Sequence, residues 1–230
     1  MKQWLARLPL SVEVLIVLLF AFGPTVPGSL AALFDPESLA RRAAPPITNS
    51  ALLRTSIHEV LVFVMLAAFL WVRGWRPQRL GLKPTLKDSA MGAALAVANY
   101  VAYVTLWLIV VNLWPRIGQI GASMHLVGPG LRLTNIVLIS IVNPLFEEVF
   151  VCGYVVTALQ PRLGMATAVN ISAGIRVFYH LYQGAIGVIG IVPMGLIFGY
   201  WFGRTGRLWP LIVAHAVGDV AGLIPYVASS

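Results

Sequence analysis

Long apolar windows recur along the whole chain and are separated by short polar connections. A helix needs about 20 apolar residues to cross a hydrocarbon core ~30 Å thick, and each window is close to that length. The pattern predicts an all-α fold, a polytopic transmembrane helix bundle with about seven spans. We place the spans at residues 12–34, 56–75, 89–113, 133–159, 163–182, 185–203 and 208–228.

The composition agrees with a chain that is surrounded by lipid. Of 230 residues, 59% are hydrophobic and 10% are charged, which leaves too few charges to cover a soluble surface. The formal net charge is +8, but the Lys and Arg residues are scattered between the apolar windows and indicate topology. We therefore expect a multi-pass integral membrane protein of the cell (inner) membrane, with the lipid bilayer and no nucleic acid among its partners.

Basic residues in the connections predict the orientation of the bundle. With the N-terminus in the cytoplasm, most of them lie on the inner side, among them Arg73, Arg76, Lys83 and Lys87, as the positive-inside rule requires. The first window resembles a signal peptide, but Glu13 interrupts it. We expect an N-terminal transmembrane helix there rather than a cleaved segment.

Two adjacent glutamates, Glu147 and Glu148, lie inside the fourth apolar window. An ionisable side chain at the centre of a membrane helix costs on the order of 2.5–3.5 kcal/mol even on the lenient insertion scale. Neighbours on an α-helix diverge by about 100°. We therefore expect one glutamate to face a shared cavity and the other to find a partner to its side.

Two later windows each contain a polar pair four residues apart, on one helix face. Arg176 and His180 form the first pair, and His215 and Asp219 form the second. With neutral histidines the carboxylates outnumber the single guanidinium, so the group would hold a divalent cation or keep one carboxylate protonated. Such residues also form purely structural ion pairs, and Glu148 with Arg176 is the pair we expect.

Two histidines and a carboxylate in a lipid-embedded cavity suit hydrolysis in two ways. In one, His180, His215 and Glu147 bind a divalent metal, zinc being the first candidate, which acidifies a bound water. In the other, no cofactor is needed, because a glutamate takes the proton from water and the histidines stabilise the oxyanion. The same groups would also suit a proton-coupled transporter, although the chain shows no repeat of the kind transporters have.

The three polar windows resemble the CPBP family of intramembrane proteases, also called the CAAX protease and bacteriocin-processing or abortive-infection family. The resemblance rests on "EEVFVCG", "YHLYQG" and "HAVGD" and covers about residues 133 to 222. It implies an intramembrane endopeptidase that cuts a membrane-associated protein or peptide. On this basis residues 1–130 are N-terminal transmembrane helices and linkers, and residues 131–230 are the catalytic core.

The resemblance also implies roles for individual residues. Glu147 would activate water, His180 and His215 would bind a metal or stabilise the oxyanion, and Asp219 would complete the third motif. Asn143 precedes Glu147 by four residues and so lies on the same helix face as a supporting residue.

Two positions depart from the family pattern. Cys152 stands where the family has an arginine, five residues after Glu147, and Arg176 stands where it has a phenylalanine, four residues before His180. A guanidinium is missing from one helix and present on another, which suggests that Arg176 neutralises Glu148. If the site is instead degraded, the protein is a catalytically inert scaffold or partner-binding relative.

The rise of an α-helix creates a difficulty for this site. At ~1.5 Å per residue, Glu147 would lie roughly 18 Å from the cytoplasmic end of its helix, His215 ~10 Å and His180 ~24 Å. These residues meet only if a helix end is misplaced or a helix is broken, and Gly174 and Pro210 are candidate break points.

Two further motifs rank below these. Gly195, Gly199 and Gly203 form a stripe of small residues that permits close helix packing, and we expect it to pack inside the bundle rather than in a dimer. His58 and Glu59 begin like a zinc-protease signature, but the residue where the second histidine belongs is a valine.

Overall fold

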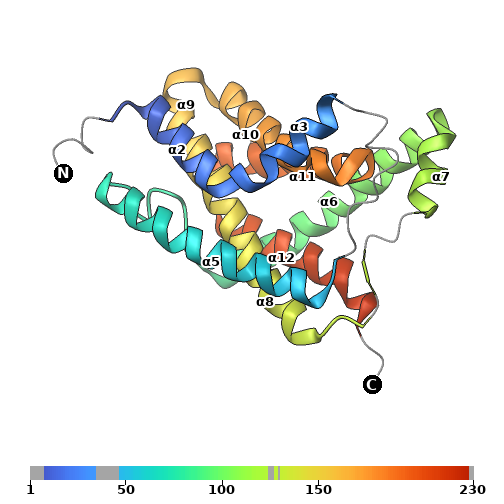
Figure 1. Ribbon diagram of the computed structural model, residues 1–230. Coiled ribbons are helices and arrows are strands. Elements are labelled where there is room, and N and C mark those ends of the chain that lie inside the picture. The colour runs from blue at the N-terminus through green and yellow to red at the C-terminus, as the bar shows by residue number, and fades with distance from the viewer. Residues whose placement is uncertain (1–7, 35–46, 124–126, 129, 228–230) are drawn as a thin grey trace.

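The computed structural model describes residues 8–34, 47–123, 127–128 and 130–227, which are almost entirely helical. The all-α prediction is confirmed: the described residues form isolated β-bridges but no strand. The helices, shown in Figure 1, are α2 Leu10–Phe22, α3 Val26–Phe34, α5 Asn49–Val72, α6 Leu86–Leu113, α7 Pro115–Ser123, α8 Leu133–Glu147, α9 Thr157–Leu163, α10 Met165–His180, α11 Gly184–Thr205 and α12 Trp209–Leu223. A π-helix, η2, spans Glu148–Val156 between α8 and α9.

Within the residues that the structure describes, six helical segments are long and apolar enough to cross a membrane: Leu10–Ala31, Asn49–Val72, Leu86–Leu113, Leu133–Leu163, Gly187–Thr205 and Trp209–Tyr226. They correspond to six of the seven predicted windows. The remaining window, 163–182, is α10, which is only 16 residues long. A transmembrane bundle is therefore confirmed, whereas the cytoplasmic N-terminus, the particular membrane and the division at residues 130 and 131 stay predictions.

Local signals explain where several helices begin and end. The hydroxyl oxygens of Thr48 and Thr85 accept hydrogen bonds from the backbone of the first turns of α5 and α6, the usual N-cap arrangement. Gly206 ends α11 in the left-handed region, at φ 62°, which a residue with a Cβ adopts less easily. α7 lies in a stretch that the sequence placed between spans, and Pro115 at its first position favours a helix start.

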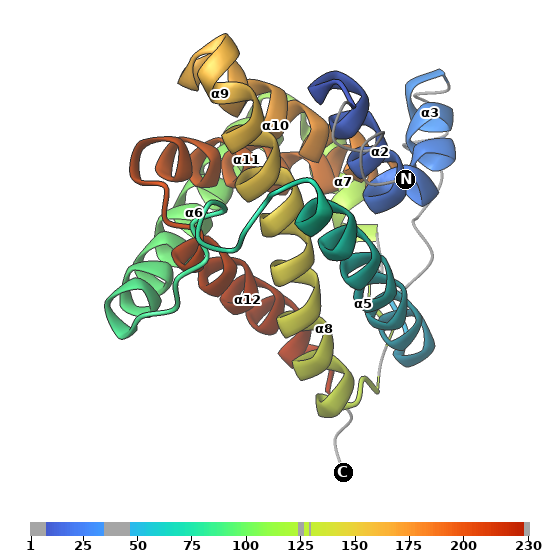
Figure 2. The same ribbon diagram turned by 90° about the vertical axis from the view of Figure 1, so that its left-hand side faces the viewer.

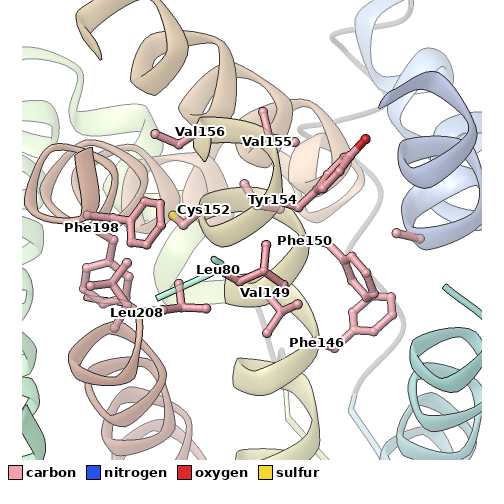
Figure 3. Close-up of a cluster of buried hydrophobic side chains, with 14 of the residues drawn as sticks. Leu80, Phe146, Val149, Phe150, Cys152, Tyr154, Val155, Val156, Phe198 and Leu208 are labelled. Atoms are coloured by element: carbon pink, nitrogen blue, oxygen red, sulfur yellow. The ribbon is translucent and has the colours of Figure 1, made fainter. Parts of the chain in front are cut away.

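The continuous segment α8–η2–α9 forms the centre of the bundle. Every residue of η2 is buried. In Figure 3, Phe146 and Phe150 point to one side of this segment and Cys152 points to the opposite side, toward Phe198. Such widened turns occur mostly as short bulges at functional sites, and here the widening begins at Glu148.

Glu13 connects the N-terminal helix to the rest of the core. Its side chain is buried, forms an ion pair with Arg73 and accepts hydrogen bonds from Trp75 Nε1 at 2.8 Å and the Tyr154 hydroxyl at 2.9 Å. These partners come from the end of α5 and from η2. The charge that interrupts the first apolar window is therefore fully paired, as a buried carboxylate must be.

The glycine stripe of α11 packs against α10. A Cβ built on Gly199 would lie 2.7 Å from Val169 Cγ1, and one on Gly203 would lie 2.9 Å from Met165 Cγ. Only glycine permits this approach, so the prediction that the stripe packs inside the bundle is confirmed.

The Gly199→Val substitution is therefore expected to lower the free energy of unfolding by about 1–3 kcal/mol, because the added atoms overlap Val169. The measurement is the denaturant midpoint of the purified protein in detergent. Gly174→Val on α10 is the matched control, since nothing lies within 4 Å of a Cβ there. Equal midpoints for the two variants would show that Val169 moves aside without loss of stability.

The helices reach the site without a break at either candidate position. α10 is continuous from Met165 to His180 across Gly174, and Pro210 lies in the first turn of α12. α11, which connects α10 to α12, crosses α8 in both Figure 1 and Figure 2, so the helices of the bundle are not all parallel. Depths calculated from the rise along each helix assumed parallel helices.

Candidate functional site

The polar residues predicted from the last windows converge at one place. Glu147 ends α8, Glu148 begins η2, Arg176 and His180 lie on α10, and His215 is on α12. Asp219 of α12, predicted as a site residue, and the supporting residue Asn143 of α8 complete the group. Four separate helical segments thus contribute to it, while the protein around it is apolar.

Arg176 lies at the centre of the group and is fully buried. Its Nη2 atom lies 2.6 Å from Glu148 Oε2, and its Nη1 atom lies 3.3 Å from Glu147 Oε2. The predicted ion pair with Glu148 is confirmed. The contact with Glu147 was not predicted, so a single guanidinium holds both carboxylates.

Cys152 lies beside the same guanidinium. Its sulfur is 3.8 Å from Arg176 Nη2, and its side chain is buried. The Arg176 guanidinium of α10 thus lies next to the position where the family pattern has an arginine. The two departures in the sequence therefore concern one place in the structure.

Glu148 positions His215 as well as Arg176. Glu148 Oε1 lies 2.8 Å from His215 Nδ1, and a carboxylate oxygen accepts, so the nitrogen donates. The other ring nitrogen, Nε2, lies 3.4 Å from Asn143 Nδ2 and 3.6 Å from Asp219 Oδ1. Asn143 also donates to Asp219 Oδ2 at 3.5 Å. Glu148 therefore has both oxygens engaged.

Glu147 keeps one oxygen free of hydrogen bonds. Its Oε2 atom accepts from the Tyr179 hydroxyl at 2.9 Å and faces Arg176. Its Oε1 atom faces His180 Nε2 at 3.8 Å, beyond direct hydrogen-bond distance. Glu147 Oε1 and His180 Nε2 thus face each other without a direct hydrogen bond.

The backbone selects the tautomer of His180. Its Nδ1 atom lies 2.9 Å from the Arg176 carbonyl oxygen, which only accepts, so Nδ1 is protonated. In the neutral ring Nε2 is then an acceptor. Glu147 Oε1 and His180 Nε2 are two acceptors that face each other, and a water beside them can donate one O–H to each.

Three residues could hold a metal ion, within the described parts of the chain: Glu147, Glu148 and His215, whose ligand atoms lie within 4.8 Å of one another. Carboxylate and imidazole donors suit a divalent cation. The set differs from the predicted one, because His180 is outside it and Glu148 is inside it. Glu148 already engages Arg176 and His215 with its two oxygens, which leaves Glu147 as the available carboxylate.

Two residues of this region were not assigned to the site from the sequence. Tyr179 directly precedes His180 in "RVFYH", and only the direction of α10 shows that its hydroxyl meets Glu147. Glu59 on α5 is buried and near enough to Glu147, Asp219 and His215 for electrostatic interaction. The sequence presented Glu59 only as part of an incomplete zinc signature, and the exposed His58 beside it takes no part in the site.

The fold and the site together define a polytopic membrane protein with buried carboxylates and histidines at its centre. Residues 129–221 match the family model described as Rce1-like, Type II CAAX prenyl endopeptidase Rce1-like. The match confirms the resemblance to the CAAX protease family over the helices that form the site. No curated protein and no solved structure gives a significant match to the chain.

Proposed function

We propose that the protein is an intramembrane endopeptidase in which Glu147 activates a water molecule for attack on a peptide bond. The family match over residues 129–221 supports the protease class. The observation that supports the mechanism is the pair of facing acceptors, Glu147 Oε1 and His180 Nε2, at 3.8 Å. Tyr179 and Arg176 fix the other oxygen of Glu147, so the free one is held in place.

The reaction needs no reactant besides water and the peptide. Glu147 takes a proton from water, the hydroxide oxygen bonds to the peptide carbonyl carbon, and a tetrahedral oxyanion forms. The C–N bond then breaks, and the amine leaves with the proton returned by Glu147. Microscopic reversibility allows one carboxylate to serve as base and then as acid.

His215 is the residue suited to stabilise the oxyanion. Glu148 holds its ring through Nδ1, so Nε2 is the nitrogen that donates to the oxyanion when the ring is protonated, while the Asn143 amide is directed at His215 Nε2 and Asp219 Oδ2. Fixed donors in a dry site stabilise developing negative charge far better than water-exposed ones. If a divalent cation binds, Glu147 and His215 are the residues that would hold it, and it would lower the pKa of a bound water.

The test of the function is cleavage by the purified protein in lipid nanodiscs, read by mass spectrometry of the products. Farnesylated peptides ending in a CAAX sequence and their unprenylated counterparts are the substrates, because the matched family is described as a prenyl endopeptidase. A single new peptide terminus is the expected result. Absence of any cleavage, with the protein folded and peptide still bound, would favour the inert partner-binding alternative.

The same assay separates the metal from the glutamate mechanism. His180→Ala and His215→Ala are each expected to abolish cleavage without preventing membrane insertion, because both rings border the reacting atoms. If Glu147 acts alone, a strong chelator leaves the wild-type rate unchanged. Inactivation by the chelator, reversed by added zinc, would instead show that a metal is required.

A further inference from the structure

Glu59 is a buried carboxylate that no contact of the site explains. Only 7% of the residue is exposed, and Oε2 has no hydrogen-bond partner within the part of the chain that the structure describes. Leaving such a group unpaired inside a protein is costly. A residue of this kind at a site points to a ligand that completes it.

The surroundings of Glu59 indicate the charge of that ligand. α5 packs against α8, and the groups that act on Glu59 are two carboxylates, Glu147 and Asp219, and the ring of His215. Arg176 is already engaged by Glu147 and Glu148, and His215 by Glu148. Neither Arg176 nor His215 is therefore free to pair with Glu59.

Glu59 also lies near the residue proposed to activate water. Glu147 is close enough to Glu59 for electrostatic interaction, and Tyr182, which is 42% exposed, is close enough to interact with both. A peptide that reaches Glu147 thus comes near Glu59 as well. Glu59 is not in the cluster of three residues that could hold a metal ion, which favours a role toward the substrate.

We propose that Glu59 is a specificity-determining residue that binds a cationic side chain, lysine or arginine, of the peptide next to the bond that Glu147 attacks. This inference rests on the proposed peptidase function. The unpaired Oε2 atom accepts from the ammonium or guanidinium group, and the positive charge of that group favours the ionised form of the carboxylate. A neutral side chain at that position leaves the carboxylate unpaired, so binding discriminates against it.

The experiment measures binding rather than turnover. Full-length protein with Glu147→Gln, in nanodiscs, is titrated with fluorescent farnesylated CAAX peptides that have a single lysine or norleucine, moved one position at a time. At one position lysine is expected to bind about tenfold or more tightly than norleucine, as for a charged hydrogen bond in a buried site. Adding Glu59→Gln should reduce that ratio to about one, whereas Glu59→Asp should retain part of it.

His58→Gln is the matched control, because the neighbouring side chain on α5 is exposed and should leave the ratio unchanged. A ratio near one at every position, or a ratio that Glu59→Gln does not alter, would overturn the role of Glu59 while the peptidase function stands. Loss of bound zinc in Glu59→Gln would make Glu59 a metal ligand and also overturn the proposal. If none of the peptides binds, the proposed function fails as well, and the two failures are thus distinguished.

Discussion

Glu147→Gln is expected to reduce peptide cleavage by at least about 100-fold, the usual contribution of a positioned general base. Glutamine has the size of glutamate, and its amide oxygen can still accept from the Tyr179 hydroxyl and Arg176 Nη1, which now contact Glu147 Oε2. What it lacks is the ability to take a proton from water. The loss should therefore appear in kcat rather than in folding, and initial rates with melting curves of the same preparations measure it.

Glu13→Gln provides the control for removing a buried carboxylate elsewhere. Glu13 is as buried as Glu147 but pairs with Arg73, Trp75 and Tyr154, away from the reacting groups. This variant should melt earlier and yet retain the turnover of its folded fraction. Turnover of Glu147→Gln equal to that of the wild type would remove Glu147 from the chemistry.

The ion pair at the site was predictable from the sequence because a charged side chain in a membrane helix needs an opposite charge or a polar partner. Glu148 and Arg176 lie in neighbouring apolar windows, where an unpaired charge is destabilising. An ion pair between them was therefore the expected arrangement. The relative directions of α8, α10 and α12 did not have to be known for that step. The internal packing of the glycine stripe on α11 was predictable in the same way, because small residues at that spacing permit close helix contact in lipid, whereas its partner α10 was not predicted.

The contacts that depend on direction could not be predicted. An α-helix turns neighbours by about 100°, which separated Glu147 from Glu148, yet both reach Arg176 because its two terminal nitrogens point to different carboxylates. The start of the π-helix at Glu148 has no sequence signal that we recognise. The role of Glu59 likewise depends on how α5 lies against α8, and hydrophobic patterning does not determine that.

The second large effect is expected at Arg176. Arg176→Phe, which restores the residue type of the family pattern, should cost about 3–5 kcal/mol in stability, because it leaves buried carboxylates unpaired. Two carboxylates lose their counter-charge here, Glu147 as well as Glu148, so activity should fall together with the melting temperature. The stability and activity of Arg176→Lys should lie between those of the wild type and Arg176→Phe. Lysine keeps the positive charge, but its ammonium lacks the planar fork with which the guanidinium contacts both carboxylates.

Cys152→Arg in the Arg176→Phe background tests whether the charge has moved between helices. Cys152 Sγ is 3.8 Å from Arg176 Nη2 and also interacts with Glu148, so an arginine there can reach the same carboxylate. Part of the lost stability and cleavage should return in the double variant, whereas Cys152→Ser alone should be nearly silent because the thiol has no role of its own.

The measurements are melting temperature and initial rate for all four proteins. Wild-type behaviour of Arg176→Phe would show that Arg176 is not the counter-charge. A double variant no better than the single one would show that position 152 cannot replace it, and would favour the inert relative.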